Sequence, residues 1–342
     1  MTETPHDQAW EARLISADAL APYAVNGLNI EGDFAARVGM LLRQQKATWP
    51  QLREATEGLA RAEYRTFQVR GSSVLAQNNP RRMVSTAAKV DTASISARPC
   101  FLCPANLPAE EQGIVWDRDY VVLCNPFPVL PDHLVIAHRR HRAQSIGDTF
   151  TDFLRLARAL GPEFFTLYNG PACGASAPDH LHFQACNRAT LPIMRDLVTR
   201  ETRHVAGPAG VEVFHMPGYR LRTLIARGRD EAALAAWFAA TYARLARLTA
   251  AGAEPMLNLI AVHDGGEWTV ILFPRGRHRP SVYYAEGEEK RTISPAGIDL
   301  AGVFIVPHPE HFPRLTDEEL EQICEEVTLD SNTFTALISG QE

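Results

Sequence analysis

The chain has 342 residues, of which 46% are hydrophobic and 22% are charged, and this is the composition of a globular protein with room for one large core or two fused modules. The formal net charge of -6 argues against a broad nucleic-acid footprint, because neutralising phosphates requires a basic face. The start of the chain lacks the pattern of a secretory signal, and apolar runs such as 303–306 are too short to span a bilayer. We therefore expect a soluble cytoplasmic protein with neither nucleic-acid nor membrane partners. Its six cysteines point to a reducing compartment, where a close cysteine pair more often binds metal or does redox chemistry than forms a structural disulfide.

The first half of the chain alternates between helical and extended patterns. Apolar residues recur at helical spacing from Phe34 to Leu42, and Pro50 predicts the start of a second short helix. A hairpin is expected at 66–77, around the turn at Gly71. Further on, the pattern predicts strands at 120–123, 134–137 and 164–168 and an amphipathic helix from Phe150 that stops before Gly161.

The second half continues the mixture. Strands are expected near 221–225, 258–262 and 269–273, with a long helix over 234–245. A last helix opens with the capping box Thr316-x-x-Glu319. Because strands and helices intermix and hairpins recur, the predicted fold class is α+β.

The two halves contain one internal echo. Residues 134–142 (LVIAHRRHR) resemble residues 271–279 (ILFPRGRHR), and in each a strand runs into a basic, histidine-bearing turn. The echo suggests a duplicated module, although chance similarity explains a single short pair equally well.

The most informative stretch is residues 168–184, YNGPACGASAPDHLHFQ. If residues 180–185 are extended, His180, His182 and Gln184 share one face, while Leu181, Phe183 and Ala185 form a core-facing set. The preceding loop contains Gly170, Gly174 and Ser176, whose small side chains allow backbone N–H groups to approach phosphate oxygens. A neutral imidazole beside a bound phosphate is a good nucleophile toward phosphorus. The alternative is that both histidines are half-buried polar residues without a catalytic role.

This segment closely resembles the active-site motif of the histidine-triad superfamily, in its transferase branch. The branch includes galactose-1-phosphate uridylyltransferase, diadenosine tetraphosphate phosphorylases and GDP-hexose phosphorylases. Their G-x-S-x-x-H-x-H-x-Q-like pattern is matched here, with one extra residue before the first histidine, by Gly174, Ser176, His180, His182 and Gln184. Residues 98–186 also resemble an uncharacterised bacterial group near these phosphorylases, in the motifs RPCFLCP and YNGPxCGASAPDH.

The resemblance implies a histidine-triad-like antiparallel sheet with flanking helices. It divides the chain into an N-terminal helical segment (1–65), a catalytic half (66–200) and a second, degenerate half (201–342). It also implies that His182 is the residue that becomes nucleotidylated and that Gln184 hydrogen-bonds a non-bridging phosphate oxygen. Asn169, Gly174 and Ser176 would make up the phosphate-binding set. Relatives dimerise through paired sheets, so a homodimer is an expectation, although a duplicated chain can form this pairing within itself.

A second motif is the pair Cys100-x-x-Cys103, which supplies half of a tetrahedral zinc site. The alternatives are a redox pair and two unliganded thiols. Carried over by position from the uridylyltransferases, the other ligands would be His141 and His180, with His138 as the alternative to His141. Four protein ligands would make this zinc ion structural. Basic residues Arg81, Arg82 and Lys89 lie where relatives bind the nucleotide.

These features together predict a nucleotidyltransferase or phosphorylase. A nucleoside diphosphate sugar or dinucleoside polyphosphate would donate its nucleotidyl group to His182, and phosphate or a sugar phosphate would accept it. A hydrolase is the first alternative, but it uses a third histidine where Gln184 stands, and an amide cannot donate an acidic proton. A catalytically decayed nucleotide sensor is the second alternative.

Overall fold

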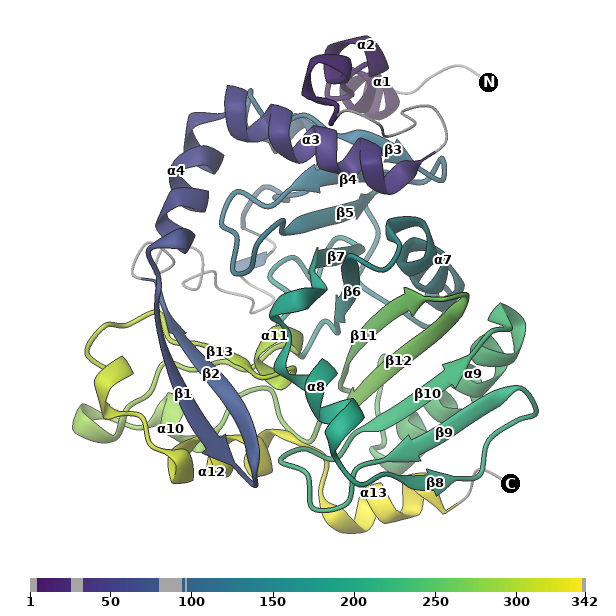
Figure 1. The fold of residues 1–342 in the computed structure, drawn as a ribbon, viewed down its shortest axis with the longest axis vertical. Coiled ribbons are helices and arrows are strands. Elements are labelled where there is room, and N and C mark those ends of the chain that lie inside the picture. Colours follow the sequence, from purple (N-terminus) through teal and green to yellow (C-terminus); the bar gives the residue numbers. More distant parts are fainter. Residues whose placement is uncertain (1–4, 26–32, 80–93, 96, 340–342) are drawn as a thin grey trace.

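The computed structural model describes residues 5–25, 33–79, 94–95 and 97–339 (Figure 1). Within these residues a large sheet has the strand order β3-β4-β5-β7-β6-β11-β12-β10-β9-β8, and every neighbouring pair is antiparallel. The strands of its first half are β3 (Ile114–Trp116), β4 (Tyr120–Cys124), β5 (Leu134–His138), β6 (Phe164–Asn169) and β7 (His182–Asn187). Those of its second half are β8 (Arg203–Val205), β9 (Val211–His215), β10 (Leu224–Gly228), β11 (Leu257–Asp264) and β12 (Glu267–Pro274).

The two halves of this sheet repeat one topology. Each has three strands in meander order, then a long helix, then a hairpin whose second strand pairs with the third strand of the meander. The helices are α7 (Phe150–Leu160) and α9 (Glu231–Leu248). The halves join where β6 pairs with β11, with Asn169 opposite Asn258. The predicted α+β fold with a duplicated antiparallel module is confirmed.

The echo that suggested the duplication does not mark equivalent positions. It pairs β5 with β12, whereas the topology makes β10 the counterpart of β5 and β12 the counterpart of β7. The chance explanation of the echo is therefore the right one. The true counterpart of β7 is the strand EWTVILFP, which has no histidine, and the 12-residue loop at 170–181 corresponds to the tight turn Gly265-Gly266. In this respect the second half is degenerate.

Helices cover one face of the large sheet. They are α3 (Phe34–Thr48), α7, α9 and, packed on α9, α13 (Ser331–Ile338). Phe183 and Ala185 of β7 belong to the apolar core on this side, as does Leu181 just before the strand. Since neighbouring side chains on a strand point to opposite faces, His182 and Gln184 point to the other side.

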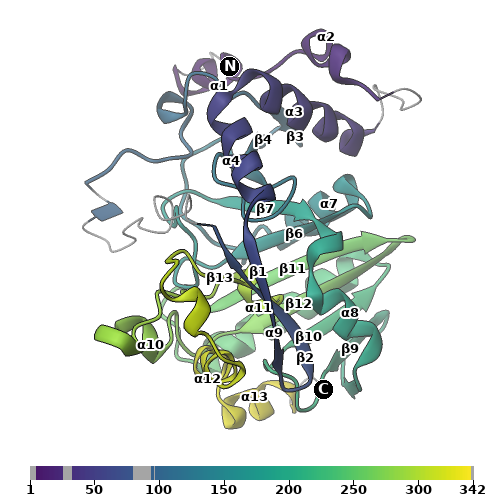
Figure 2. The ribbon, with the colours of Figure 1, turned by 60° about the vertical axis from the view of Figure 1, so that its left-hand side comes forward.

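The opposite face carries a second layer. It contains a three-stranded sheet made of β1 (Glu63–Val69), β2 (Ser72–Asn78) and β13 (Val303–Ile305), in which β13 pairs with β2 in parallel. Short helices complete the layer: α8 (Pro192–Thr199), α10 (Ser281–Tyr284), α11 (Gly297–Leu300) and α12 (Asp317–Val327). Figure 2 shows the long β1–β2 hairpin beside β13 and α12. This layer brings residues near 300, from the second half, over the centre of the large sheet, where α11 packs on β6.

At the N-terminal end lie α1 (Pro5–Glu11), α2 (Ala17–Leu20) and α4 (Pro50–Ala60), in addition to α3. They pack beside the β3 edge of the sheet (Figure 1). No helix in the described part of the chain is long and apolar enough to cross a membrane.

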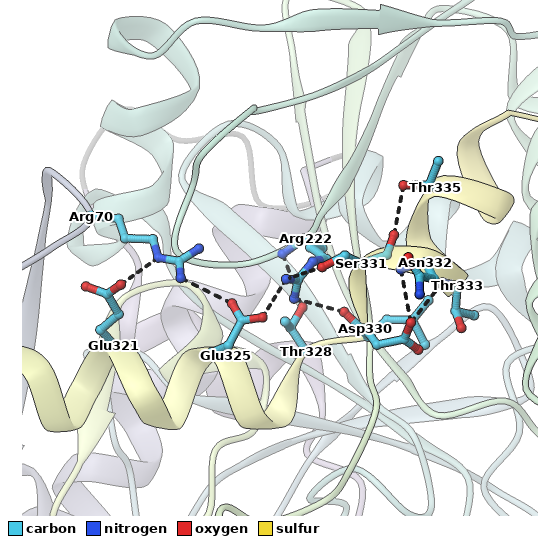
Figure 3. Close-up of polar contacts among 11 residues, drawn as sticks. Arg70, Arg222, Glu321, Glu325, Thr328, Asp330, Ser331, Asn332, Thr333 and Thr335 are labelled. Atoms are coloured by element: carbon cyan, nitrogen blue, oxygen red, sulfur yellow. Dashed lines mark hydrogen bonds and ion pairs between the residues drawn. The ribbon is translucent and has the colours of Figure 1, made fainter.

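Helix α12 ties the β1–β2 hairpin to the second half of the sheet (Figure 3). It begins with the predicted capping box of Thr316 and Glu319. Arg70, in the hairpin turn, contacts Glu321 at 2.8 Å and Glu325 at 3.3 Å, and Glu325 also accepts a hydrogen bond from Arg222. Ion pairs as exposed as those of Arg70 contribute little each. The stabilisation of α12 therefore comes mainly from its buried apolar face, which comprises Leu320, Ile323, Cys324 and Val327.

Candidate active site

Two cysteines and two histidines meet beside the loop that precedes β7. The ligand atoms of Cys100, Cys103, His141 and His180 all lie within 4.8 Å of one another. Nδ1 of His180 is 3.2 Å from Sγ of Cys100 and 3.7 Å from Sγ of Cys103, and Nδ1 of His141 is 3.3 Å from Sγ of Cys103. Ideal tetrahedral zinc geometry places sulfur and nitrogen ligands about 3.6 Å apart. The cluster can therefore hold a metal ion of this size.

The alternative ligand, His138, has another role. Its Nδ1 contacts the backbone of Arg140, and its carbonyl oxygen accepts a hydrogen bond from Nε2 of His180 at 2.7 Å. Because a carbonyl can only accept, the proton of His180 sits on Nε2 and leaves the Nδ1 lone pair facing the sulfurs. The backbone of His138 thus orients His180, and its ring stays out of the cluster.

His182, the first residue of β7, is the neighbouring imidazole. Only 3% of it is exposed, and burial lowers its pKa, so the ring is neutral near pH 7. Its Nδ1 is 2.8 Å from the carbonyl oxygen of His180, which requires a proton on Nδ1. The lone pair therefore lies on Nε2, and the ring lines a cavity. This is the tautomer that a nucleophilic histidine needs.

Gln184 lines the same cavity and is oriented by a histidine that the motif did not reveal. Nδ1 of His133 accepts a hydrogen bond from the backbone N–H of Val129, so its Nε2 carries the proton and donates to Oε1 of Gln184 at 2.8 Å. The amide oxygen of Gln184 is thereby engaged. Its NH₂ group is left to donate to a ligand in the cavity.

A second unpredicted residue, Gln144, holds the strands together at the site. Its Nε2 donates to the carbonyl oxygens of Asn169 and His182, and its Oε1 accepts from the backbone N–H of His182 at 2.9 Å. The side chain is buried. Gln144 therefore fixes the backbone of the predicted nucleophile to the end of β6. No sequence motif indicated this role for Gln144, although the residue lies just after the basic turn at 139–142.

The three predicted phosphate ligands lie around the cavity. Gly174 has φ of +98°, and a Cβ there would stand 2.6 Å from Cβ of Ala296, so the loop conformation requires glycine. Ser176 is exposed in the same loop. Oδ1 of Asn169 accepts hydrogen bonds from Nδ2 of Asn258 and from the backbone N–H of Gly297, which leaves its NH₂ group for the cavity.

The cavity has a volume of about 540 Å³, which is within the range of small-molecule sites. His182, Gln184, Asn169, Gly174 and Ser176 all line it. The second half contributes polar side chains to the wall, including His278, Arg279, Ser294 and Asp299. Burial raises the pKa of Asp299 to about 6, although two backbone N–H groups partly offset this by donating to its carboxylate.

The basic residues of the turn after β12 do not all line the cavity. Arg275 does not reach the cavity: it is buried, and its guanidinium donates to Asn258 and to backbone carbonyls, so it is part of the framework. Arg279 lines the cavity, 3.0 Å from Oγ of Ser294. Arg81, Arg82 and Lys89 lie outside the described residues.

Comparisons with known proteins agree with this arrangement. Residues 41–187 match the domain of unknown function DUF4922, and residues 195–340 match the GDPGP1-like C-terminal domain. No curated protein sequence matches the chain. Yeast Ap4A phosphorylase Apa2 in complex with Ap4A is similar in structure, with a TM-score of 0.54 and 15% identity over 84% of this chain and 97% of that chain. Its complex with AMP gives a TM-score of 0.53 and 15% identity over 84% and 96% of the two chains.

A GalT-like protein from Arabidopsis thaliana aligns with a TM-score of only 0.34 at 14% identity, over 78% of this chain and 99% of that chain. The likeness to Apa2 establishes the fold. The resemblance to the transferase branch of the histidine-triad superfamily is thus confirmed at the level of the fold.

The loop geometry can be tested at Gly174. Gly174→Ala should lower the free energy of unfolding by about 1–3 kcal/mol, because it combines a left-handed backbone with a contact to Ala296. The matched control is Gly218→Ala, since Gly218 has φ of +65° and nothing within 4 Å of the added Cβ. Urea unfolding should show the smaller loss for the control, and equal losses would mean that Ala296 does not constrain the loop.

Proposed function

We propose that this chain is a nucleotidyltransferase of the phosphorylase type. His182 would take a nucleoside monophosphate from a nucleoside diphosphate sugar or a dinucleoside polyphosphate and pass it to phosphate or a sugar phosphate. The observation that carries the proposal is the free Nε2 of a neutral, buried His182 in a cavity lined by a glycine-requiring loop. The Apa2-like fold supports the reaction class.

In the first step Nε2 of His182 attacks the α-phosphorus of the donor. An N–P bond forms, the P–O bond to the leaving group breaks, and the electron pair leaves with a phosphate or phosphorylated product. The ring then carries phosphorus on Nε2 and a proton on Nδ1, so it is a cation. The carbonyl oxygen of His180, 2.8 Å from Nδ1, stabilises this charge. In the second step an oxygen of the acceptor attacks the same phosphorus, and the N–P bond breaks.

The NH₂ groups of Gln184 and Asn169 are the donors available to the non-bridging oxygens. Both are pre-oriented, since the oxygen of each amide is already hydrogen-bonded to protein. Such donors act without reorganisation as charge develops on phosphorus. Backbone N–H groups of the Gly174–Ser176 loop would complete the phosphate site.

We further propose that the cluster of Cys100, Cys103, His141 and His180 holds zinc. Two thiolates and two imidazoles suit this ion, and four protein ligands leave no open position, so the metal would be structural. Its effect on the reaction is positional. Holding the ring of His180 fixes the peptide whose carbonyl selects the tautomer of His182.

The decisive test is a covalent intermediate. Incubation with a nucleoside diphosphate sugar or dinucleoside polyphosphate, without acceptor, should add one nucleoside monophosphate to His182, measurable by intact mass and peptide mapping. The adduct should be labile to acid, stable to mild alkali and lost when phosphate is added. His182→Ala should abolish adduct and turnover, and retention of near-parental turnover would refute the proposed nucleophile.

The role of Gln184 can be tested by restoring a third histidine. Gln184→His supplies a group that can protonate a leaving group or assist water, so transfer to phosphate should fall and the hydrolysed fraction should rise. Chromatography of the products with and without phosphate measures this ratio. If the ratio matches that of the parent protein, Gln184 does not determine the reaction class.

The metal proposal predicts about one zinc per chain by elemental analysis. Cys100→Ser should lower both the zinc content and the melting temperature, because it removes a buried ligand. Cys186→Ser is a suitable control, since Cys186 is also buried but lies in an apolar cluster. A parent protein free of metal, or a Cys100→Ser variant with full zinc, would contradict the assignment.

A further inference from the structure

The connection that precedes β11 belongs to the second half, yet it lies beside the loop that carries the site motif. Since β6 and β11 are antiparallel, the start of β11 lies beside the end of β6 (Figure 1). The backbone N–H of Gly170, just after β6, donates to the carbonyl oxygen of Leu257, the first residue of β11. The equivalent connection in the first half spans only residues 161–163, whereas this one spans residues 249–256. The longer connection carries Glu254 to this point.

The carboxyl group of Glu254 joins two segments of the first half. Its Oε2 accepts a hydrogen bond from the backbone N–H of Ile146 at 2.8 Å, and its Oε1 accepts one from the hydroxyl of Tyr168 at 2.7 Å. Ile146 and Tyr168 are both fully buried in the core on the helical side of the large sheet. Glu254 therefore holds the end of β6 and the segment that follows β5 in a fixed relation to each other.

Glu254 acts through hydrogen bonds. Burial raises the pKa of its carboxyl group, and the contacts that offset this are the hydrogen bonds from Ile146, Tyr168 and the side chain of Ser145. A buried polar group of this kind keeps a defined orientation only while its hydrogen-bond partners are in place. The arrangement of Glu254 and its partners is thus set by geometry.

The segment that Glu254 holds contains Gln144. The side chain of Gln144 hydrogen-bonds to the backbone N–H and to the carbonyl oxygen of His182, and its own backbone N–H donates to the carbonyl oxygen of Pro178 at 3.0 Å. One residue separates Gln144 from Ile146. A displacement at Ile146 is therefore passed on to Gln144 and, through it, to the backbone of His182.

We infer that Glu254 is a positioning residue for the proposed transfer through His182. Its hydrogen bonds set the place of Gln144, which in turn holds the backbone from which the imidazole of His182 enters the cavity. The inference rests on the proposed function, because the nucleophile is defined there. Glu254 does not line the cavity, so its effect on the reaction is on the placement of the nucleophile, to which rates are very sensitive.

Two substitutions at this position separate a hydrogen-bonding role from a role of the charge. Glu254→Ala removes both contacts. Glu254→Gln can keep both, because the amide oxygen accepts from the N–H of Ile146 and the NH₂ group donates to the phenolic oxygen of Tyr168, which accepts as well as donates. The glutamine variant should therefore behave like the parent protein, whereas a role of the negative charge would be lost in both variants.

The first measurement is hydrogen exchange of the full-length protein, which needs no ligand. Glu254→Ala should speed exchange about tenfold in residues 144–149 and 178–184, because the lost hydrogen bonds favour local opening of these segments. The matched control is Asp196→Ala, since Asp196 is a buried carboxyl of α8 that accepts from the hydroxyl of Tyr219. The control should leave exchange in both segments at the parental rate.

The second measurement is the rate at which the His182 adduct forms, with diadenosine tetraphosphate and with ADP-, CDP-, GDP- and UDP-glucose as donors. At saturating donor, Glu254→Ala should slow the step about tenfold and change the half-saturating donor concentration by less than about twofold, because no contact with the donor is lost. A merely structural role would lower the fraction of protein that becomes labelled and leave the rate constant unchanged.

Three results would overturn the inference: parental exchange in Glu254→Ala, a Glu254→Gln variant as impaired as Glu254→Ala, or a raised half-saturating concentration at an unchanged rate. If no donor labels His182 in the parent protein, the proposed function fails, and exchange still decides whether Glu254 anchors this backbone. If Glu254→Ala does not fold, Tyr168→Phe removes one hydroxyl from the same contact and should speed exchange in the same segments to a smaller extent. An unchanged exchange rate in that variant would also overturn the inference.

Discussion

The site depends on one residue that acts in two directions. The ring of His180 enters the cluster of cysteines and histidines, while its carbonyl oxygen accepts the Nδ1 proton of His182. The ring is itself oriented by the carbonyl of His138 on the neighbouring strand. One hydrogen bond therefore links the backbone of β5 to the ring of His180, and a second links the backbone of His180 to the imidazole of His182 in the cavity. Its effect is to determine which nitrogen of His182 has a lone pair, and a nucleophile at this position requires that nitrogen to be Nε2.

The repeated topology explains how one chain builds both sides of the cavity. The first half supplies His182, Gln184 and the glycine loop. The second half, in which the strand equivalent to β7 has no histidine, supplies Arg279, Ser294 and Asp299. The two halves meet at the pair of Asn169 and Asn258, and the buried Arg275 holds Asn258. The buried guanidinium of Arg275 thus orients Asn258, whose amide in turn holds Asn169 at the cavity wall.

Much of the fold could be predicted because local patterns and tertiary packing agree. The alternation around Phe183, the helical spacing after Phe150 and the capping box at Thr316 all correspond to elements in the structure. The candidate site was visible where its residues are adjacent in sequence, as in residues 174–184. His133 and Gln144 were not, because each acts through contacts with residues distant in sequence, which a single sequence does not display. The similarity of residues 271–279 to residues 134–142 does not mark equivalent strands, because similar sequences arise wherever a strand ends in a basic turn.

The continuous sheet has a consequence for how the protein responds to its ligands. Two identical modules in a symmetric pair would hold two equivalent sites, and occupancy of one could alter the other through the shared central strands. Here the β6–β11 junction lies within a single chain, and β12, the strand equivalent to β7, has no counterpart of His182. The proposed transfer through His182 therefore has one site per chain, so saturation by donor should follow a simple hyperbola without half-of-the-sites behaviour.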